Sequence, residues 1–259
     1  TTRAHRPFEE HHMNVALASM LSISILLGSG FSAASSDAIT EVIRAQNPSA
    51  DKLPNAPAWR PDNASDVLVM VQGFYDGTAD LEAKFKQTYW NPTYGEAKKT
   101  SGKLKLKKPG KMVWDYKDGQ DADYYANGDT LWMVEHDTRQ VIKTSVAGNS
   151  EVNAALKFLF GGEQLTREFK VRYAKKDKLE RYGDADHYVL ELKPKSANKH
   201  YKGLVLMVHA TTGRVDSFVV YNTDGSSNYF RLRGIKTNVG IGDKLFDFKL
   251  PSGYVETVE

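Results

Sequence analysis

Cysteine is absent from the 259 residues of this sequence. In an exported protein, this absence excludes disulfide bonds, and it also excludes a lipid attached to a cysteine after the signal segment. Two motifs of hydrolytic enzymes, Gly-x-Ser-x-Gly and His-Glu-x-x-His, are absent as well. The sequence also lacks a long run of lysine and arginine, and its formal net charge is only +3. We therefore expect neither an enzyme nor a nucleic-acid-binding protein.

Three stretches are similar to ligand sites but match them poorly. Residues 95–103 (GEAKKTSGK) combine glycine, lysine and hydroxyl groups without the spacing of a phosphate-binding loop, and they lead into a strand instead of a helix. Asp184, Asp186 and His187 lie at a predicted turn, where charged residues are common. His209 alternates with apolar residues on a predicted strand, which is more typical of a core histidine than of a ligand. We expect no metal and no cofactor.

The N-terminal segment, residues 1–35, is predicted to be a signal peptide. Residues 15–27 form an uncharged apolar run that is too short to span a bilayer comfortably, and small residues at 32–35 suit a signal peptidase. A buried helix is the alternative. The true start stays open between Thr1 and Met13, because no lysine or arginine follows Met13 directly. We expect an exported, soluble protein that is neither anchored nor spanning.

Residues 36–63 are predicted to be a proline-rich N-terminal extension. A short helix could form over 36–46, but four prolines then prevent any regular element. These prolines are Pro48, Pro54, Pro57 and Pro61. The role of this extension stays open.

The 41% hydrophobic content allows a sizeable core, and length alone suggests one or two domains, of which residues 64–259 are taken as a single domain on the resemblance described below. A capped helix is expected from Ser65 to a stop at Gly77, with Val67, Met70, Val71 and Phe74 on one face. Beyond it, apolar and polar residues alternate in short segments separated by turns at 127–128, 212–213 and 224–225. This pattern predicts an antiparallel sheet with one apolar and one hydrated face. The apolar face needs a cover.

A helix over residues 151–160 is the candidate cover. Its last turns place four large apolar residues almost all the way round: Leu156, Phe158, Leu159 and Phe160. Two interpretations stay open, an ordinary core helix or a movable lid over a hydrophobic cavity, with Gly161 and Gly162 as the hinge.

The segment 101–109 has an unusual lysine. Leu104 and Leu106 alternate with Lys103, Lys105 and Lys107, as in a strand with one hydrated face. Lys108 breaks the alternation and falls on the leucine side. Whether the face of Lys103, Lys105 and Lys107 meets a partner or only water stays open, and a hydrated face is the better interpretation.

The order of these features resembles the outer-membrane lipoprotein carrier proteins of Gram-negative bacteria, the LolA type. The similarity covers about residues 65–258. It is carried by Phe85-x-Gln87, by Gly-x-Leu-x-Leu-x-Lys-Pro from Gly102 to Pro109, by Trp114, and by the segment from Asn127 to Trp132.

This resemblance implies a mainly β (α+β) fold, an unclosed antiparallel half-barrel whose concave apolar face is covered by helices. It implies a periplasmic chaperone that carries acylated lipoproteins from an ATP-driven inner-membrane releasing complex to an outer-membrane lipoprotein receptor, if present. Lys108, where the family often has arginine, would be the latch between barrel and lid. The expected acyl-chain cavity is lined by Phe85, Leu104, Leu106, Trp114, Leu131, Leu156, Phe158, Leu159 and Phe160.

Rival interpretations use the same fold or the same ligand. A periplasmic lipid- or lipoprotein-binding sensor is the alternative function, although it would need a further signalling domain. The outer-membrane receptor is itself a lipoprotein, which a chain without cysteine cannot be. A lipid hydrolase is disfavoured because its nucleophile motif is missing.

Overall fold

The structure is a computed structural model that describes residues 56–57, 59–93, 95–118, 122–146, 165–196 and 201–258. The predicted signal peptide (1–35), the extension up to residue 55 and the predicted helix 151–160 lie outside these residues. Four expected cavity residues lie outside them as well, namely Leu156, Phe158, Leu159 and Phe160.

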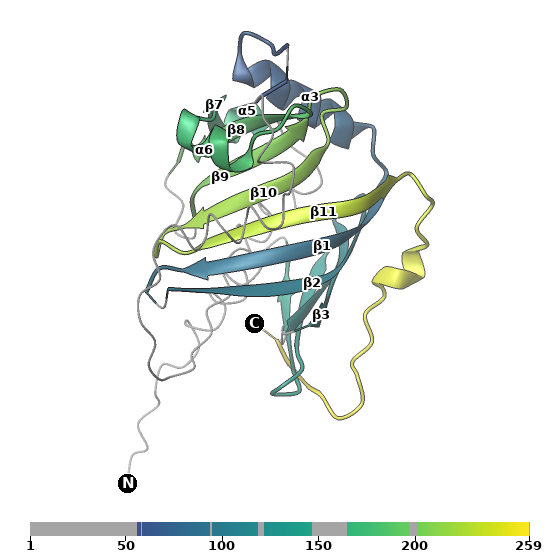
Figure 1. The fold of residues 1–259 in the computed structure, drawn as a ribbon. Coiled ribbons are helices and arrows are strands. Elements are labelled where there is room, and N and C mark those ends of the chain that lie inside the picture. Colours follow the sequence, from purple (N-terminus) through teal and green to yellow (C-terminus); the bar gives the residue numbers. More distant parts are fainter. Residues whose placement is uncertain are drawn as a thin grey trace.

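One sheet contains all the strands of the described residues (Figure 1). They are β1 (Asp80–Asn91), β2 (Glu96–Lys107), β3 (Lys111–Asp118), β4 (Ala122–Asn127), β5 (Thr130–Glu135), β6 (Gln140–Ser145), β7 (Phe169–Tyr173), β8 (His187–Pro194), β9 (Tyr201–His209), β10 (Val215–Asn222), β11 (Ser227–Thr237) and β12 (Val255–Val258). Their order is β12-β6-β5-β4-β3-β2-β1-β11-β10-β9-β8-β7. Neighbours are antiparallel except β12 and β6, which are parallel.

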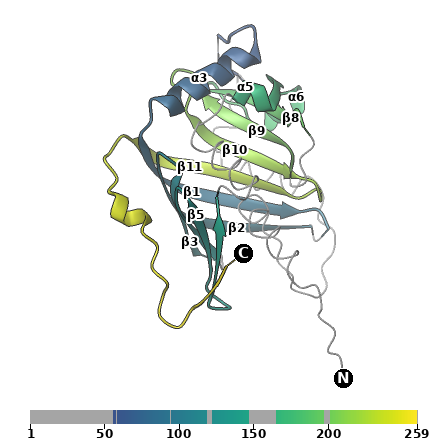
Figure 2. The ribbon, with the colours of Figure 1, turned by 180° about the vertical axis from the view of Figure 1, so that it is seen from behind.

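The sheet is curved but open. Its edge strands, β12 and β7, do not pair with each other. Figures 1 and 2 show the curvature, because β3 runs at a steep angle to β1 although both belong to the same sheet. The predicted mainly β, unclosed half-barrel is confirmed. The predicted turns are also present, and Gly128, Gly213 and Gly225 within them have φ values of 107°, 74° and 91°.

Helix α3 (Ala64–Asp76) covers one face of the sheet, which we call the concave face. Val67, Leu68 and Val71 are at most 1% exposed and pack on it. At about 1.5–3 kcal/mol per buried aliphatic side chain, these three contribute about 5–8 kcal/mol as an upper estimate. The helix ends before Gly77 as predicted. The predicted cap is wrong, because the N-cap residue is Asn63 and its side chain makes no capping hydrogen bond.

The opposite, convex face is not simply hydrated, so that prediction is wrong at two places. Helix α6 (Lys176–Tyr182) lies over one apolar cluster, whose buried members are Ala174, Tyr182, Val189, Val205, Met207, Val219 and Tyr229. A second cluster contains Trp132, Val134 and Val141, with Phe248 and Tyr254 packed against it.

The C-terminal strap, residues 238–258, supplies the cover of this second cluster. It leaves the sheet after β11, includes the 3-10 helix η2 (Asp243–Phe246), and returns as β12 beside β6. Figure 2 shows it in yellow on the outer side of β3 and β5. Among the described helices, which also include α5 (Leu165–Glu168), none has the length and apolar content needed to cross a membrane.

Candidate functional site

A small apolar cavity of about 20 Å³ lies between α3 and the concave face. Val71 and Tyr75 of α3 and Leu165 of α5 line it on the helix side. On the sheet side it is lined by Leu81, Leu104, Leu106, Val215, Phe218 and Leu232. This volume holds about one water molecule, whereas ligand pockets measure roughly 300–1,000 Å³. The space between α3 and the sheet is therefore far smaller than an ordinary ligand pocket.

Aromatic side chains continue the concave face beyond the cavity. The ring centroids of Phe85 and Trp114 are 5.1 Å apart, and that of Phe230 lies 5.4 Å from Trp114. Phe218, which also lines the cavity, stacks on Phe230 at 4.8 Å. The cavity and the aromatic cluster therefore belong to one apolar surface.

Gly102 leaves room for the ring of Phe85 on this surface. The two residues are directly opposite each other on β2 and β1. A Cβ atom at position 102 would lie 2.6 Å from the Phe85 ring and 2.0 Å from the carbonyl oxygen of Asp115. The ring therefore occupies the space that a side chain at position 102 would need. This contact gives a physical reason for glycine at the start of the Gly-x-Leu-x-Leu-x-Lys-Pro run.

A buried polar group lies beside the aromatic cluster. Gln87 is 1% exposed, and its Nε2 donates to Asn228 Oδ1 at 2.6 Å. Its Oε1 accepts from Tyr116 OH at 2.8 Å and from Thr100 Oγ1 at 3.2 Å. Burial raises the pKa of Tyr116 well above its ordinary value, so its hydroxyl stays a donor. These bonds satisfy a glutamine side chain in an apolar surface.

The predicted cavity residues that the structure describes lie in one core. Phe85, Leu104, Leu106, Trp114 and Leu131 are all buried in the cluster that packs against α3. Only Leu104 and Leu106 line the cavity itself. The remaining lining residues were not predicted from the sequence, although the apolar face of the helix, which includes Val71, was a usable signal for the opposite wall.

Lys108 contacts the C-terminal end of α3. Its Nζ donates to the carbonyl of Tyr75 and lies 3.4 Å from the carbonyl of Asp76. The last carbonyls of a helix have no partner within the helix and carry partial negative charge, so an ammonium is favourable there. Asn238 Nδ2 donates to the next carbonyl, that of Gly77, at 3.1 Å.

The preceding residue, Lys107, contacts the C-terminal strap instead. Its Nζ donates to the carbonyl of Ile241 at 2.7 Å and lies 2.9 Å from Asp243 Oδ1, which Lys111 also contacts at 2.7 Å. Hydrogen bonds from Lys111 and Lys107 lower the pKa of Asp243. Lys107 therefore contacts another segment of the chain and not only water, and this corrects the expected hydrated lysine face at its last member. Lys103 is exposed.

The charged residues at the predicted turn form an ion-pair network. His187 Nδ1 lies 2.7 Å from Asp184 Oδ1, and Nε2 lies 3.1 Å from Asp216 Oδ2. Burial alone would lower the pKa of His187, but the hydrogen bonds with both aspartates raise it to about 9. A protonated imidazole donates a hydrogen bond through each of its two nitrogens, which matches the contacts with the two aspartates. Within the described ranges, no group of three histidine or acidic residues is placed to bind a metal.

Comparison with known proteins gives one family. Residues 76–249 match the family model described as outer membrane lipoprotein carrier protein LolA. A curated outer-membrane lipoprotein carrier protein of Legionella pneumophila (strain Paris) is 31% identical over 185 residues, 71% of this chain and 86% of that protein. The corresponding protein of Actinobacillus succinogenes is 29% identical over 174 residues, 67% of this chain and 76% of that protein.

This chain is also similar to proteins of known structure. The LolA superfamily protein NE2245 from Nitrosomonas europaea is 13% identical, with a TM-score of 0.40. The match covers 73% of this chain and 99% of that chain.

Proposed function

The chain belongs to the outer membrane lipoprotein carrier protein (LolA) family, and on this premise we propose that it binds the acyl chains of lipoproteins and carries them through the periplasm. The family consists of carriers and not of enzymes. In this proposal, residues 1–35 are the signal peptide. An ATP-driven complex of the inner membrane supplies the lipoprotein, and a receptor at the outer membrane accepts it.

The observation that supports the proposal is an apolar concave face covered by α3, with a small apolar cavity between the helix and the sheet. A long acyl chain exposed to water costs on the order of 10 kcal/mol, at about 0.8 kcal/mol per methylene. The three buried side chains of α3 contribute a comparable amount, about 5–8 kcal/mol. Replacing helix contacts by acyl contacts is therefore nearly balanced, so loading requires little net energy from the carrier itself.

The proposed acyl-chain surface consists of the concave residues already expected from the sequence. Its described members are Phe85, Leu104, Leu106, Trp114 and Leu131. Val71 and Tyr75 are added to it from α3. Lys108 is proposed as the latch, meaning the donor that keeps the C-terminal end of α3 near β2.

Uptake of a labelled, acylated lipoprotein by the purified protein tests this function. Leu104→Glu places a carboxylate in the cavity and should reduce uptake by more than tenfold, because the charge must lose its hydration when the chain binds. Lys105→Glu changes the neighbouring residue on the opposite face and should take up lipoprotein normally. Equal uptake by both folded variants would refute the concave site.

A reversible lock tests the same proposal without a buried charge. The chain has no cysteine of its own, so cysteines that replace Val71 and Leu104 can be joined selectively by a short, cleavable thiol crosslinker. The joined protein should not load, and cleavage should restore loading. Loading by the joined protein would show that α3 does not cover the acyl site. Recovery of the mature protein without any lipoprotein from a periplasmic extract would favour the sensor.

A further inference from the structure

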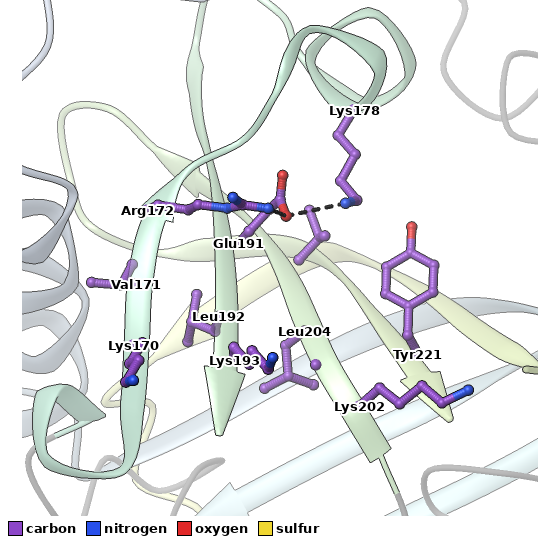
Figure 3. A pocket seen from close by; sticks show the side chains of 12 residues that line it. Lys170, Val171, Arg172, Lys178, Glu191, Leu192, Lys193, Lys202, Leu204 and Tyr221 are labelled. Carbon is purple, nitrogen blue, oxygen red and sulfur yellow. Dashed lines mark hydrogen bonds and ion pairs between the residues drawn. The ribbon is translucent and has the colours of Figure 1, made fainter. Parts of the chain in front are cut away.

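A second hollow, of about 470 Å³, lies on the convex face, away from the acyl site (Figure 3). Strands β7, β8 and β9, the end of β10 and helix α6 contribute its walls. Its lining contains five basic residues and one acidic residue. The acidic residue is Glu191, and the basic residues are Lys170, Arg172, Lys178, Lys193 and Lys202. On β7 and β8, the charged lining residues alternate with residues of the concave core, which places these charged side chains on the other face of the sheet.

Glu191 is already neutralised by its neighbours. Arg172 Nη2 lies 2.9 Å and Lys178 Nζ 3.1 Å from its Oε2, and the backbone N–H of Lys175 donates to its Oε1 at 3.0 Å. Burial raises the pKa of Glu191, but the hydrogen bonds from these three donors outweigh it and lower the pKa to about 2. The dashed lines in Figure 3 show the two ion pairs. The negative charge of Glu191 is therefore already balanced by two positive charges, those of Arg172 and Lys178.

The remaining three lysines lie on the neighbouring strands β7, β8 and β9 and line the same hollow. Lys170 of β7 is directly opposite Lys193 of β8. On the other side of Lys193, the register Leu192 to Leu204 brings Gly203 and Lys202 of β9 next to it. Within the described part of the chain, none of the three lysines has an ion pair. Like charges directly opposite each other destabilise a sheet, and a bound anion would remove this cost.

Gly203 keeps the hollow open beneath these lysines. A Cβ atom at this position would come within 2.8 Å of the carbonyl oxygen of Leu192, so the neighbouring strand leaves no room for a side chain there. Tyr221 and the buried Val205 supply apolar surface beside the lysines. The site therefore combines positive charge with room for an organic group.

We propose that this hollow, the lysine hollow, binds the phosphate group of a phosphate-bearing organic molecule such as a glycerophosphate. Three ammonium groups match a phosphate, which carries up to two negative charges and presents several acceptor oxygens. A carboxylate is matched best by the fork of an arginine, and the arginine of this site, Arg172, is already paired with Glu191. The volume exceeds that of a bare phosphate ion and accommodates the glycerol group against Tyr221.

The chain contains a matched row of basic residues that lacks this arrangement. Lys84 of β1 is opposite Lys103 of β2 and near Arg233 of β11 on the convex face. In this row, Asp115 of β3 is directly opposite Lys103 of β2, so a carboxylate lies next to the lysines. This row therefore serves as a control for lysines whose charge is balanced within the sheet.

Binding of glycerol 3-phosphate to the full chain, measured calorimetrically at low ionic strength, tests the proposal. Lys193→Glu pairs with Lys170 and Lys202 and should weaken binding by about tenfold or more, whereas Lys103→Glu should change it little. The same variants are then tested for flotation with vesicles that contain phosphatidylglycerol. Binding of the soluble ester identifies a small phosphate ligand, and Lys193-dependent binding to vesicles alone identifies a lipid headgroup as its source.

Three results would overturn the proposal. The first is that the protein binds in neither assay. The second is that Lys193→Glu and Lys103→Glu lose the same amount of affinity. The third is that polyglutamate binds more tightly than the phosphate ester. Lipoprotein uptake should be unchanged in Lys193→Glu. Uptake therefore reports on the acyl site independently of the lysine hollow.

Discussion

The two faces of the sheet have covers that are attached by different kinds of contact. On the concave face, α3 contributes buried aliphatic side chains, and its C-terminal end is attached by hydrogen bonds to carbonyls from Lys108 and Asn238. On the convex face, the C-terminal strap also has apolar contacts, such as Phe248 on Trp132, but charged groups attach it at several points along its length. Asp243 pairs with two lysines, and Glu256 lies 3.4 Å from Lys143.

A buried carboxylate fixes the first residues of the strap. Asp80 is 5% exposed and accepts from the backbone N–H groups of Val239, Gly240 and Ile241 at 2.8, 3.0 and 3.1 Å. Directional, charge-assisted bonds are lost at once when a segment moves, whereas apolar contacts can be exchanged for those of a ligand. Because its contacts with the sheet are mainly apolar, α3 is the cover that is better suited to move.

The largest expected effect concerns the surface under α3. Gly102→Ala should lower the free energy of unfolding by about 3 kcal/mol, because the new methyl group overlaps the Phe85 ring and the Asp115 carbonyl. Gly73→Ala in α3 is the matched control, since no atom lies within 4 Å of its added Cβ. It should stabilise the protein by up to about 1 kcal/mol. Denaturant unfolding measures both, and equal stabilities would contradict the close contact.

A pH-dependent effect tests the charged groups beside α3. The folded-state pKa of His187 is raised from its ordinary 6.5 to about 9, so its stabilisation is fully present below pH 6.5 and is lost as the pH rises through 9. His187→Gln should therefore be less stable than the parent by up to about 3 kcal/mol at pH 6. The difference should disappear near pH 10. A difference that does not change with pH would show that His187 is not charged in the folded protein.

The next effect concerns the strap. Asp80→Asn should lower the free energy of unfolding by about 2 kcal/mol, because three backbone donors lose a charged acceptor in a buried position. Asp243→Asn is the control, and its effect should be smaller because Asp243 is exposed and its ion pairs are hydrated. Both variants should take up lipoprotein normally. Impaired uptake in Asp80→Asn alone would mean that the strap takes part in loading.

The sequence predicted the concave half of this comparison better than the convex half. The strict alternation of Lys103 to Lys107 placed Leu104 and Leu106 correctly in the core, since the strand period assigns faces without knowledge of the partner. The alternation also placed Lys108 on the leucine side, and its Nζ contacts the end of α3, whereas the predicted lid, helix 151–160, lies outside the described residues. The acyl role of these residues stays a proposal, because contacts with a ligand depend on a cover that moves.

The convex half could not be predicted in the same way. Strand β12 is four residues long with no buried side chain, so only its pairing with β6 defines it. Helix α6 has seven residues, too few for a periodic pattern. One usable signal was overlooked, namely that Leu131 to Val134 are apolar on both faces of β5, which requires a cover on each side.

The smallest expected change in stability has the most specific consequence for transfer. Lys108→Leu removes the donor to the Tyr75 and Asp76 carbonyls and should cost about 1 kcal/mol. Only the closed, empty state loses this contact, so loading should be normal or better. Return of α3 to the closed state should then contribute less to expelling the cargo. Transfer from preloaded carrier to receptor should slow several-fold, since 1.4 kcal/mol corresponds to tenfold.

Two further variants decide whether Lys108 acts through α3. Lys108→Arg retains donors for the same carbonyls and should transfer at least as well as the parent. Lys107→Leu removes the neighbouring ammonium, which contacts the strap, and should lower stability without slowing transfer. Because the two lysines are adjacent but contact covers on opposite faces, unequal transfer rates would identify the concave cover as the moving one. Equal transfer by all four proteins would leave Lys108 as a static contact at a strand end.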